Sequence, residues 1–199
     1  IYVLPAVIGE FRRRHPGIDL RLRIANSRVI EEAIRAHEVD LGVVGGQRLA
    51  AGEECLAAGL VDELVLIVAP RLRWARRHEI APPDLTDEPL LVREEGSATR
   101  RVTERALEEA GVGWRASMEL NHTEAIKQGV MAGLGVAFVS VHAVRGEVAS
   151  RRLAALRLRG LRIQRHFHVI HSEARTLSVG ARAFVATLSQ RAERRRGRG

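Results

Sequence analysis

The spacing of hydrophobic and polar residues changes repeatedly along the chain and predicts alternating helices and strands. Over residues 1–14, apolar side chains recur every three or four positions, which predicts a helix that ends at His15-Pro16-Gly17. Residues 18–24 then alternate strictly between apolar and polar, as in a strand with one face in water. A second helix is expected over residues 28–36, with Asn26-Ser27 at its start.

The same alternation of elements continues to the end of the chain. Short apolar runs bounded by glycine or proline predict strands, and apolar residues at helical spacing predict the segments between them. Because strands and helices alternate, the chain is expected to form an α/β fold with mostly parallel sheets. The expected strands are residues 41–45, 64–69, 90–93, 115–120, 136–140, 153–158 and 163–171; further helices are expected over 98–110, from 121–124 to 133, over 141–149 and over 176–190, and a loop over 45–59.

Three of the predicted strand-to-helix turns carry polar residues that suit ligand binding. They are Asn26-Ser27, Ser97-Ala98-Thr99-Arg100 and Asn121-His122-Thr123. In parallel sheets, ligands bind at the carboxyl ends of the strands, where helix N-termini present N–H groups to anions. Side-chain capping explains each turn equally well when that turn is taken alone. The three turns together favour a cleft lined by hydroxyl, amide and N–H donors.

The middle turn belongs to the stretch Arg93–Arg100, the centre of the candidate site. Gly96 permits a sharp turn, and Ser97 is a good N-cap. Thr99 and Arg100 would add a hydroxyl and a guanidinium group to the backbone donors. The alternative interpretation is a capped helix with an arginine on the surface.

Composition places the chain among soluble globular proteins. It has 199 residues, of which 46% are hydrophobic and 28% charged, enough for one substantial domain or two small lobes. No apolar run approaches the roughly 18 residues needed to span a membrane. Because the first residue is Ile1 and the chain opens within a helical pattern, we expect a fragment of a longer polypeptide.

The net charge of +8 is concentrated at the C-terminus. Residues 191–199 contain five arginines and one glutamate, which is half of the net charge. Such a segment predicts a solvated, disordered tail, with DNA contact as a weaker alternative. Aromatic residues make up 4% of the chain, too few for a surface on which bases stack.

Metal and redox chemistry are not predicted. Cys55 is the single cysteine, which excludes an internal disulfide and a thiolate metal cluster and favours a reducing compartment. A cysteine among small residues is more typical of an inert side chain than of a nucleophile. His166, His168 and His171 lie in one strand pattern without the further partners that a metal would need.

Catalysis is not predicted either. Glu94 and Glu95 are adjacent and have no accompanying nucleophile, so they are poor candidates for paired acid and base. The chain has no phosphate-binding loop, dinucleotide glycine pattern or His-Glu-x-x-His motif. His122, at a candidate cleft turn, is either a solvated histidine or a pH-responsive ligand contact.

Several motifs of the chain match a known family in their order and spacing. The matching segments are Tyr2-Val3-Leu4-Pro5, Phe11-Arg12, His15-Pro16-Gly17, Glu38–Val44, Asp62–Val68, Arg93–Arg100, Glu124–Lys127 and Gly133–Ala137. On these segments the chain resembles the effector-binding domain of LysR-type transcriptional regulators over residues 1–190. The helix that carries Lys127 and the loop at 93–100 look most like the subgroup that regulates carbon fixation and sulfur metabolism.

The resemblance implies a fold like that of type 2 periplasmic binding proteins. Two α/β lobes would be joined by two crossovers and would hold an effector in the cleft. Residues 1–69 and 144–190 would form lobe I, residues 70–143 lobe II, and residues 191–199 the basic tail. The family's winged helix-turn-helix and linker helix would lie upstream and are absent from this chain.

The resemblance also implies the ligand-binding residues. One polar residue of the family's site precedes the first helix and would lie upstream of Ile1. Ala98 stands where many members have glycine, which would tighten the loop. The implied ligand-binding residues are Asn26, Ser27, Ser97, Thr99, Arg100, Asn121, His122, Thr123, Val139 and Ser140.

The implied function is that of a non-enzymatic, cytoplasmic sensor domain without cofactor, metal or membrane contact. A small, anionic effector would change how DNA-binding domains are spaced in a homodimer or tetramer. The helix at 1–14 and the strand at 18–24 would pack against the partner's helix near 123–132. Two alternatives are a solute-binding protein of a transport system and an enzyme on the same scaffold. An upstream helix-turn-helix would support the regulator, and a signal peptide the transport protein.

Overall fold

The computed structural model describes residues 4–46 and 53–196. The chain folds as two compact units, Ile1–Leu60 with His166–Gly199 (unit 1) and Val61–Arg165 (unit 2). Strands β2 (Glu53–Val68) and β8 (Gln164–Ser172) each continue along the chain from one unit into the other. The expected lobe boundaries, at 69/70 and 143/144, differ from the boundaries of these two units. The division into lobes stays a prediction.

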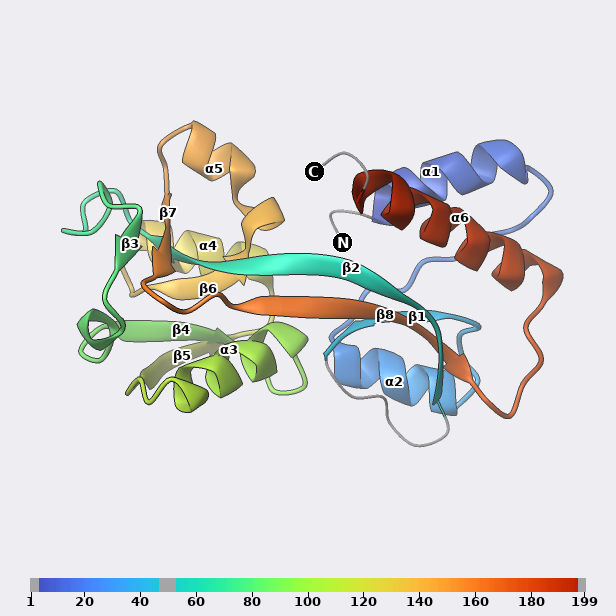
Figure 1. The fold of residues 1–199 in the computed structure, drawn as a ribbon, viewed down its shortest axis with the longest axis horizontal. Coiled ribbons are helices and arrows are strands. Elements are labelled where there is room, and N and C mark those ends of the chain that lie inside the picture. The colour runs from blue at the N-terminus through green and yellow to red at the C-terminus, as the bar shows by residue number, and fades with distance from the viewer. Residues whose placement is uncertain (1–3, 47–52, 197–199) are drawn as a thin grey trace. The chain divides into compact units, whose positions relative to one another are not determined.

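Unit 1 consists of helices packed against a few strands. It contains helices α1 (Leu4–Arg14), α2 (Ser27–Arg35) and α6 (Val179–Arg196), together with strand β1 (Gly42–Gly45). β1 pairs antiparallel with β8, and β8 in turn neighbours β2. Helix α1 lies beside α6 (Figure 1). Between them the rings of Phe11 and Phe184 meet edge to face, with their centroids 5.2 Å apart.

Unit 2 is built on strands that meet helix N-termini. β2 pairs antiparallel with β6 and β7, β7 pairs parallel with β3, and β4 pairs parallel with β5. A parallel bridge between Leu90 and Val136 places β4 beside the start of β6. The elements are β3 (Glu79–Ile80), η1 (Pro82–Leu85), β4 (Pro89–Arg93), α3 (Ala98–Glu109), β5 (Arg115–Leu120), α4 (Thr123–Ala132), β6 (Ala137–Ser140), η2 (Val141–Ala143), α5 (Arg145–Ala149) and β7 (Ala154–Leu158).

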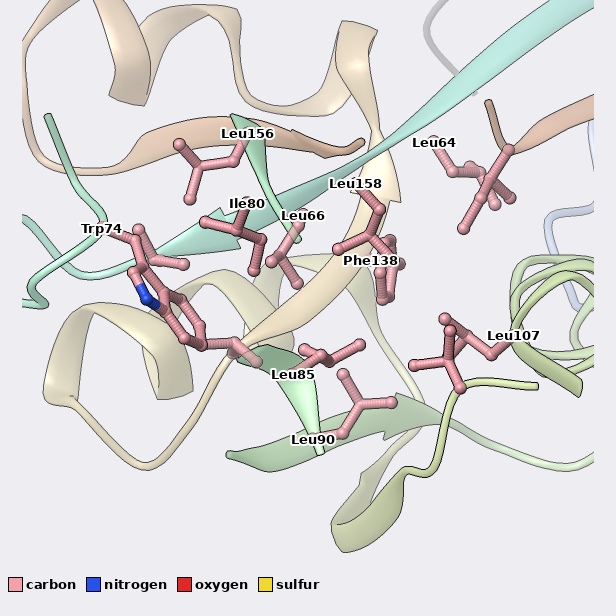
Figure 2. Close-up of a cluster of buried hydrophobic side chains, with 14 of the residues drawn as sticks. Leu64, Leu66, Trp74, Ile80, Leu85, Leu90, Leu107, Phe138, Leu156 and Leu158 are labelled. Carbon is pink, nitrogen blue, oxygen red and sulfur yellow. The ribbon is translucent and has the colours of Figure 1, made fainter. Parts of the chain in front are cut away.

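The core of unit 2 lies on both faces of β4. Leu90 belongs to a buried cluster with Leu107 of α3 and Phe138 of β6, labelled in Figure 2. Its neighbour Leu91 belongs to a second cluster with Ile126 of α4. Because successive strand residues point to opposite faces, α3 covers one face of β4 and α4 covers the other. This packing fixes both helices at the end of the sheet.

Two expected elements in unit 1 differ from the structure. The strand predicted at 18–24 is wrong, since that segment is not a strand in the described part of the chain. Leu22 and Ile24 are 52% and 61% exposed there, so the alternating pattern does not correspond to a buried face. The expected loop at 45–59 is wrong from Glu53 onward, where β2 begins, and residues 47–52 lie outside the described residues.

Three further differences concern the C-terminal half and the sheets. The helix expected at 141–149 is divided into η2 and α5. Helix α6 continues to Arg196, so residues 191–196 are helical rather than a disordered tail, and residues 197–199 lie outside the described residues. The sheets are mixed rather than mostly parallel, because β1–β8, β2–β6 and β2–β7 are antiparallel pairs. Within residues 4–46 and 53–196, no helix combines the length and apolarity needed to cross a membrane.

Candidate functional site

The candidate site is the edge of unit 2 where three strands end and three helical segments begin. β4 leads into α3, β5 into α4 and β6 into η2. β4 and β5 are parallel, and β4 is bridged in parallel to the start of β6, so all three carboxyl ends meet at one edge. This carboxyl edge of unit 2 brings together the predicted turns at Ser97–Arg100 and Asn121–Thr123 with Ser140.

Ser97 stands at the start of α3 without acting as a side-chain cap. It is the N-cap residue, in an extended conformation with φ −72° and ψ 127°, yet its side chain makes no capping hydrogen bond in the described structure. The first bond of the helix runs from Arg101 N–H to the Ser97 carbonyl, so the N–H groups of residues 98–100 precede the helical ladder. Because Ser97 is only 3% exposed, its hydroxyl is a buried polar group beside these donors.

The start of α4 is also uncapped by a side chain. Its N-cap is His122, which makes no side-chain capping bond among the described residues. Asn121 is therefore not the N-cap, and the carboxylate of Glu124 binds Lys127 at 2.7 Å and Gln128 at 2.8 Å. Asn121 and His122 are exposed, and Thr123 is half-buried.

Arg93 connects the two helix starts. Its Nη1 donates to Thr123 Oγ1 at 3.1 Å, and its Nε and Nη2 donate to the two carboxylate oxygens of Glu94 at 2.8 and 3.0 Å. A bidentate pair of this kind fixes the plane of the guanidinium. The loop before α3 is thereby tied to the first residue of α4.

Arg165 connects the start of α3 to β2. Its Nη1 donates to Thr99 Oγ1 at 2.6 Å, and its Nε and Nη2 lie 2.9 and 2.7 Å from Asp62 Oδ2. Asp62 also accepts from the Ser140 hydroxyl at 2.7 Å, and Ser140 Oγ accepts from the backbone N–H of His142 at 3.2 Å. One buried chain of hydrogen bonds therefore runs from β6 to α3.

Burial acts against the charge of Arg165. Desolvation lowers the pKa of Arg165, and the positive charge of Arg93 lowers it further, whereas Asp62 raises it. The guanidinium stays protonated because an arginine pKa is so high to begin with. The carboxyl edge therefore holds two half-buried arginines whose charges repel each other.

Two residues of the predicted site have other contacts. The Arg100 guanidinium binds the carboxylates of Glu104 and Glu119 and also the backbone carbonyl of Arg93. The hydrogen bond with Glu104 is the main cause that raises the pKa of Arg100. Val139 is buried in the core of unit 2, opposite Val65. Ligand contact by Arg100 and Val139 stays a prediction.

Asn26 and Ser27 belong to unit 1, where both side chains bind the backbone. Asn26 is the N-cap of α2, as predicted, and its Oδ1 accepts from Val29 N–H at 3.1 Å. Ser27 Oγ accepts from Gly45 N–H at 3.2 Å and so holds the end of β1. Their proposed contact with a ligand stays a prediction.

Sequence reasoning missed Asp62 and Arg165 as members of the site. Asp62 is an acidic residue next to the apolar run of β2, and Arg165 stands within the strand pattern of β8. Their meeting depends on strand packing between distant segments, so the sequence offered only a weak signal: a charged residue at a position where the strand pattern is apolar.

The histidines of β8 have separate partners. His168 Nε2 lies 2.7 Å from the Gly46 carbonyl oxygen, and His171 Nε2 lies 2.8 Å from Glu54. Cys55 Sγ is 3.7 Å from His168 Nδ1. Across the described residues, no group of three or more His, Cys, Asp or Glu side chains is placed to hold a metal ion.

Comparison with known proteins matches almost the whole chain to one family. Residues 1–193 match the model of the LysR substrate binding domain. The chain is 38% identical over 190 residues to the HTH-type transcriptional regulator CbbR of Xanthobacter flavus, covering 95% of this chain and 57% of that protein. It is 34% identical over 184 residues to the RuBisCO operon transcriptional regulator of Allochromatium vinosum, covering 92% of this chain and 60% of that protein. The chain thus spans less than two thirds of these relatives.

Solved structures give the same result. The regulatory domain of CcmR from Synechocystis PCC6803, in complex with 2-PG, has a TM-score of 0.87 and 29% identity, with 96% of this chain and 92% of that chain covered. The effector-binding domain of QuiR in complex with shikimate has a TM-score of 0.86 at 15% identity, covering 96% and 91%, which is a likeness of fold. These findings confirm the predicted α/β fold and the predicted resemblance. The chain belongs to the LysR family, as a non-enzymatic effector-binding domain of LysR-type transcriptional regulators.

Proposed function

We propose that the carboxyl edge of unit 2 binds a small anionic effector. The observation that carries this proposal is that two threonine hydroxyls at the edge each accept a hydrogen bond from an arginine. Arg165 donates to Thr99 Oγ1 at 2.6 Å, and Arg93 donates to Thr123 Oγ1 at 3.1 Å. A hydroxyl that accepts a hydrogen bond keeps its own proton for a second partner, and a charged donor on its oxygen strengthens that donation. Both threonines are thus prepared to donate to an anion.

Backbone groups add to these side-chain donors. The N-termini of α3 and α4 carry N–H groups and the positive ends of the helix dipoles. The buried hydroxyl of Ser97, which does not cap α3, is a further donor for the same ligand. Helix N-termini and hydroxyls of this kind bind carboxylate or phosphate groups without a free cationic side chain.

The arginines of the edge serve to orient donors rather than to supply net charge. Arg93 is matched by Glu94, Arg165 by Asp62, and Arg100 by Glu104. In this proposal the ligand is selected by directed hydrogen bonds, and Arg100 has a structural role at the start of α3. Asn26 and Ser27 of unit 1, with His122 of unit 2, are proposed as secondary contacts.

The relatives support an anionic effector. CcmR, whose regulatory domain is similar to this chain over nearly its whole length, was solved with 2-PG. We propose that the present chain binds a small oxyanion of the same kind. The match of residues 1–193 to regulators also favours a regulator over a solute-binding protein of a transport system.

For the whole protein we propose a transcription regulator that works in the cytoplasm, where its DNA is. DNA would be bound by a winged helix-turn-helix outside this chain, because the relatives are longer than the region that matches. A homodimer or tetramer would carry the effector's signal, since a ligand shifts an oligomer only through its different affinities for two states.

Calorimetry on the 199-residue chain tests the site. Inorganic phosphate and 2-phosphoglycolate are titrated into wild type and into Ser97→Ala and Thr99→Val. Loss of one hydrogen bond to a charged group should weaken binding about tenfold in each variant. Thr99→Ser, which keeps the hydroxyl, should bind within about twofold of wild type.

Ser117→Ala is the matched control. Its hydroxyl donates to the Leu90 carbonyl at 3.3 Å within the same unit, away from the helix starts, so its removal should leave the affinity unchanged. Wild-type affinity in both Ser97→Ala and Thr99→Val would contradict the proposed site.

A further inference from the structure

Two arginine-rich segments of the chain lie side by side on unit 2. Residues 71–79 and 151–162 together contain nine arginines and a single acidic residue, Glu79. The segments meet at both ends, because Val68 of β2 pairs with Ala154 of β7 and the Arg157 N–H donates to the His78 carbonyl at 3.0 Å. All nine arginines are exposed, and both segments lie wholly within unit 2. We call these nine arginines the basic surface.

The packing of the apolar side chains turns these arginines outward. Trp74 is 1% exposed, and it belongs with Leu156 and Leu158 to the buried cluster shown in Figure 2. Because successive residues of a strand point to opposite faces, Arg157 leaves β7 on the side away from this cluster. A tight turn around Trp74, in which the Arg77 N–H donates to the Trp74 carbonyl at 2.8 Å, holds the first segment. The basic surface is therefore presented by a packed backbone.

The charge of the basic surface exceeds that of the carboxylates that contact it. Arg76, Arg77 and Arg151 make no ion pair among residues 4–46 and 53–196. An arginine stays protonated throughout the physiological pH range, so the excess of positive charge is permanent. The carboxylates that form ion pairs with the other arginines of the surface belong to four residues, Glu63, Glu79, Glu88 and Glu147.

This chemistry suits the phosphates of a nucleic acid better than the surface of an acidic protein. A protein interface needs apolar anchors at its centre, whereas every large apolar side chain of these two segments is buried or half-buried. Binding to a DNA backbone needs cations, and a guanidinium group can bind a phosphate through two parallel hydrogen bonds. Since Trp74 is buried, its ring is not available to stack on unpaired bases, which favours a duplex over a single strand.

We propose that the basic surface of unit 2 binds the phosphate backbone of duplex DNA without reading its sequence. The inference rests on the proposed function in that the DNA would be brought by a DNA-binding domain outside this chain. Backbone contacts alone give dissociation constants on the order of 10⁻⁴–10⁻⁶ M at physiological salt. A surface tethered to DNA that is already bound acts at an effective concentration on the order of millimolar, so this weak contact would hold flanking DNA against unit 2.

The test measures binding of a fluorescent duplex of arbitrary sequence to the 199-residue chain by anisotropy over a range of salt concentrations. Arg76→Gln combined with Arg77→Gln removes two exposed arginines that make no ion pair in the described structure. This double variant should weaken binding about tenfold at low salt and reduce the slope of log affinity against log salt by about 2. Arg151→Gln, from the other segment, should reduce the slope by about 1.

Two further double variants change the charge equally elsewhere. Arg12→Gln with Arg13→Gln is the matched control, since these adjacent arginines of α1 are exposed and also make no ion pair among the described residues. It should bind DNA within about twofold of wild type. Equal losses in both double variants would overturn the proposal, because net charge alone would then explain binding. A loss confined to Arg194→Gln with Arg195→Gln would overturn it as well and assign the contact to the C-terminal arginines.

A second probe separates DNA from an acidic protein partner. The duplex should bind more tightly than polyglutamate of the same total charge, because its phosphates lie at high density along a rigid axis. Polyglutamate that binds as tightly as the duplex, with the same loss in the Arg76 and Arg77 double variant, would overturn DNA as the partner.

The basic surface and the effector site fail in different ways. Calorimetry with 2-phosphoglycolate should give wild-type affinity in the Arg76 and Arg77 double variant, since neither arginine belongs to the carboxyl edge. A chain that does not bind the duplex at low salt contradicts the basic surface and leaves the effector site in place. Unchanged effector affinity in Ser97→Ala and Thr99→Val contradicts the effector site and leaves the DNA contact in place.

Discussion

Arg165 Nη1 donates a hydrogen bond of 2.6 Å to Thr99 Oγ1, which joins the start of β8 to the first turn of α3. The same guanidinium binds Asp62 on β2, and both charged side chains are largely buried. Arg165 and Asp62 stand next to the ends of unit 2, where the chain passes into unit 1 along β8 and β2. The proposed effector site is thus built directly onto the two crossover strands.

Removal of one partner of this buried pair should strongly destabilise the chain. Arg165→Gln leaves the Asp62 carboxylate, whose side chain is 5% exposed, without its cation. Breaking a buried ion pair in this way costs about 3–5 kcal/mol. Urea denaturation should show this loss in the free energy of unfolding.

Two further variants make this prediction specific. The double variant Asp62→Asn with Arg165→Gln should recover part of the loss, because no buried charge is then left unpaired. Arg159→Gln is the control, because its ion pair with Glu79 is exposed and should contribute less than about 1 kcal/mol. Equal effects of Arg165→Gln and Arg159→Gln would argue against a buried pair at the site.

Lys127 should make the stability of unit 2 depend on pH at low pH. Its ammonium group lies 2.7 Å from Glu124 and 2.8 Å from Glu147 and donates to the Ala143 carbonyl, so it joins α4 to η2 and α5. Hydrogen bonds from Lys127 lower the pKa of both carboxyl groups below 4.5. A carboxyl group whose pKa is lower in the folded than in the unfolded chain stabilises the fold at any pH above its unfolded-state pKa. This stabilisation is lost as the pH falls through the folded-state pKa.

The window for this effect is therefore from about pH 4.5 downward. At high pH the titrating group is Lys127 itself. Desolvation lowers the pKa of Lys127, but its hydrogen bonds with Glu124 and Glu147 outweigh desolvation and raise that pKa above 10.5. The stabilisation by Lys127 is present at any pH below its unfolded-state pKa and is lost as the pH rises through the raised folded-state pKa. Urea titrations from pH 7 to pH 3 should show a smaller fall in stability for Glu147→Gln than for wild type. An identical fall in both proteins would contradict the prediction.

Sequence reasoning located much of unit 2 because its signals are local. The apolar runs of β4, β5 and β6 and the helix starts at Ser97 and Thr123 each lie within a few residues. Polar turn residues and glycines mark such ends in the sequence, although Ser97 and His122 make no side-chain capping bond in the described structure. The predicted polar turns of unit 2 therefore fell at the same edge of the sheet.

The remaining features depend on contacts between distant segments. The alternating residues 18–24 satisfy the local pattern of a strand, but a strand also needs a hydrogen-bonded neighbour, and in the described structure this segment forms no ladder with another strand. Asp62 and Arg165 come from different strands, and they meet because β8 lies next to β2 in the sheet. No periodicity within one segment carries that information, which is why the hydroxyl donors were predicted and the arginine that orients Thr99 was not.

Gly133 should be sensitive to substitution because of its conformation and of the arginine beside it. It ends α4 with φ 83°, and a Cβ at this position would lie 1.9 Å from Arg71 Nη2. That same Nη2 donates to the Ala132 carbonyl at 2.6 Å and so binds the C-terminal end of the helix. Gly133→Ala therefore strains the backbone and displaces the arginine.

The expected loss is about 1–2 kcal/mol in the free energy of unfolding, measured by urea denaturation. Gly17→Ala is the matched control, because no atom lies within 4 Å of a Cβ built there. It should leave stability within about 0.5 kcal/mol of wild type. Since Arg71 is one of the two causes of the loss, adding Gly133→Ala to an Arg71→Ala background should cost less than adding it to wild type. If Gly133→Ala costs the same in both backgrounds, the loss comes from the backbone conformation alone, and the contact between Arg71 and the end of α4 contributes nothing measurable.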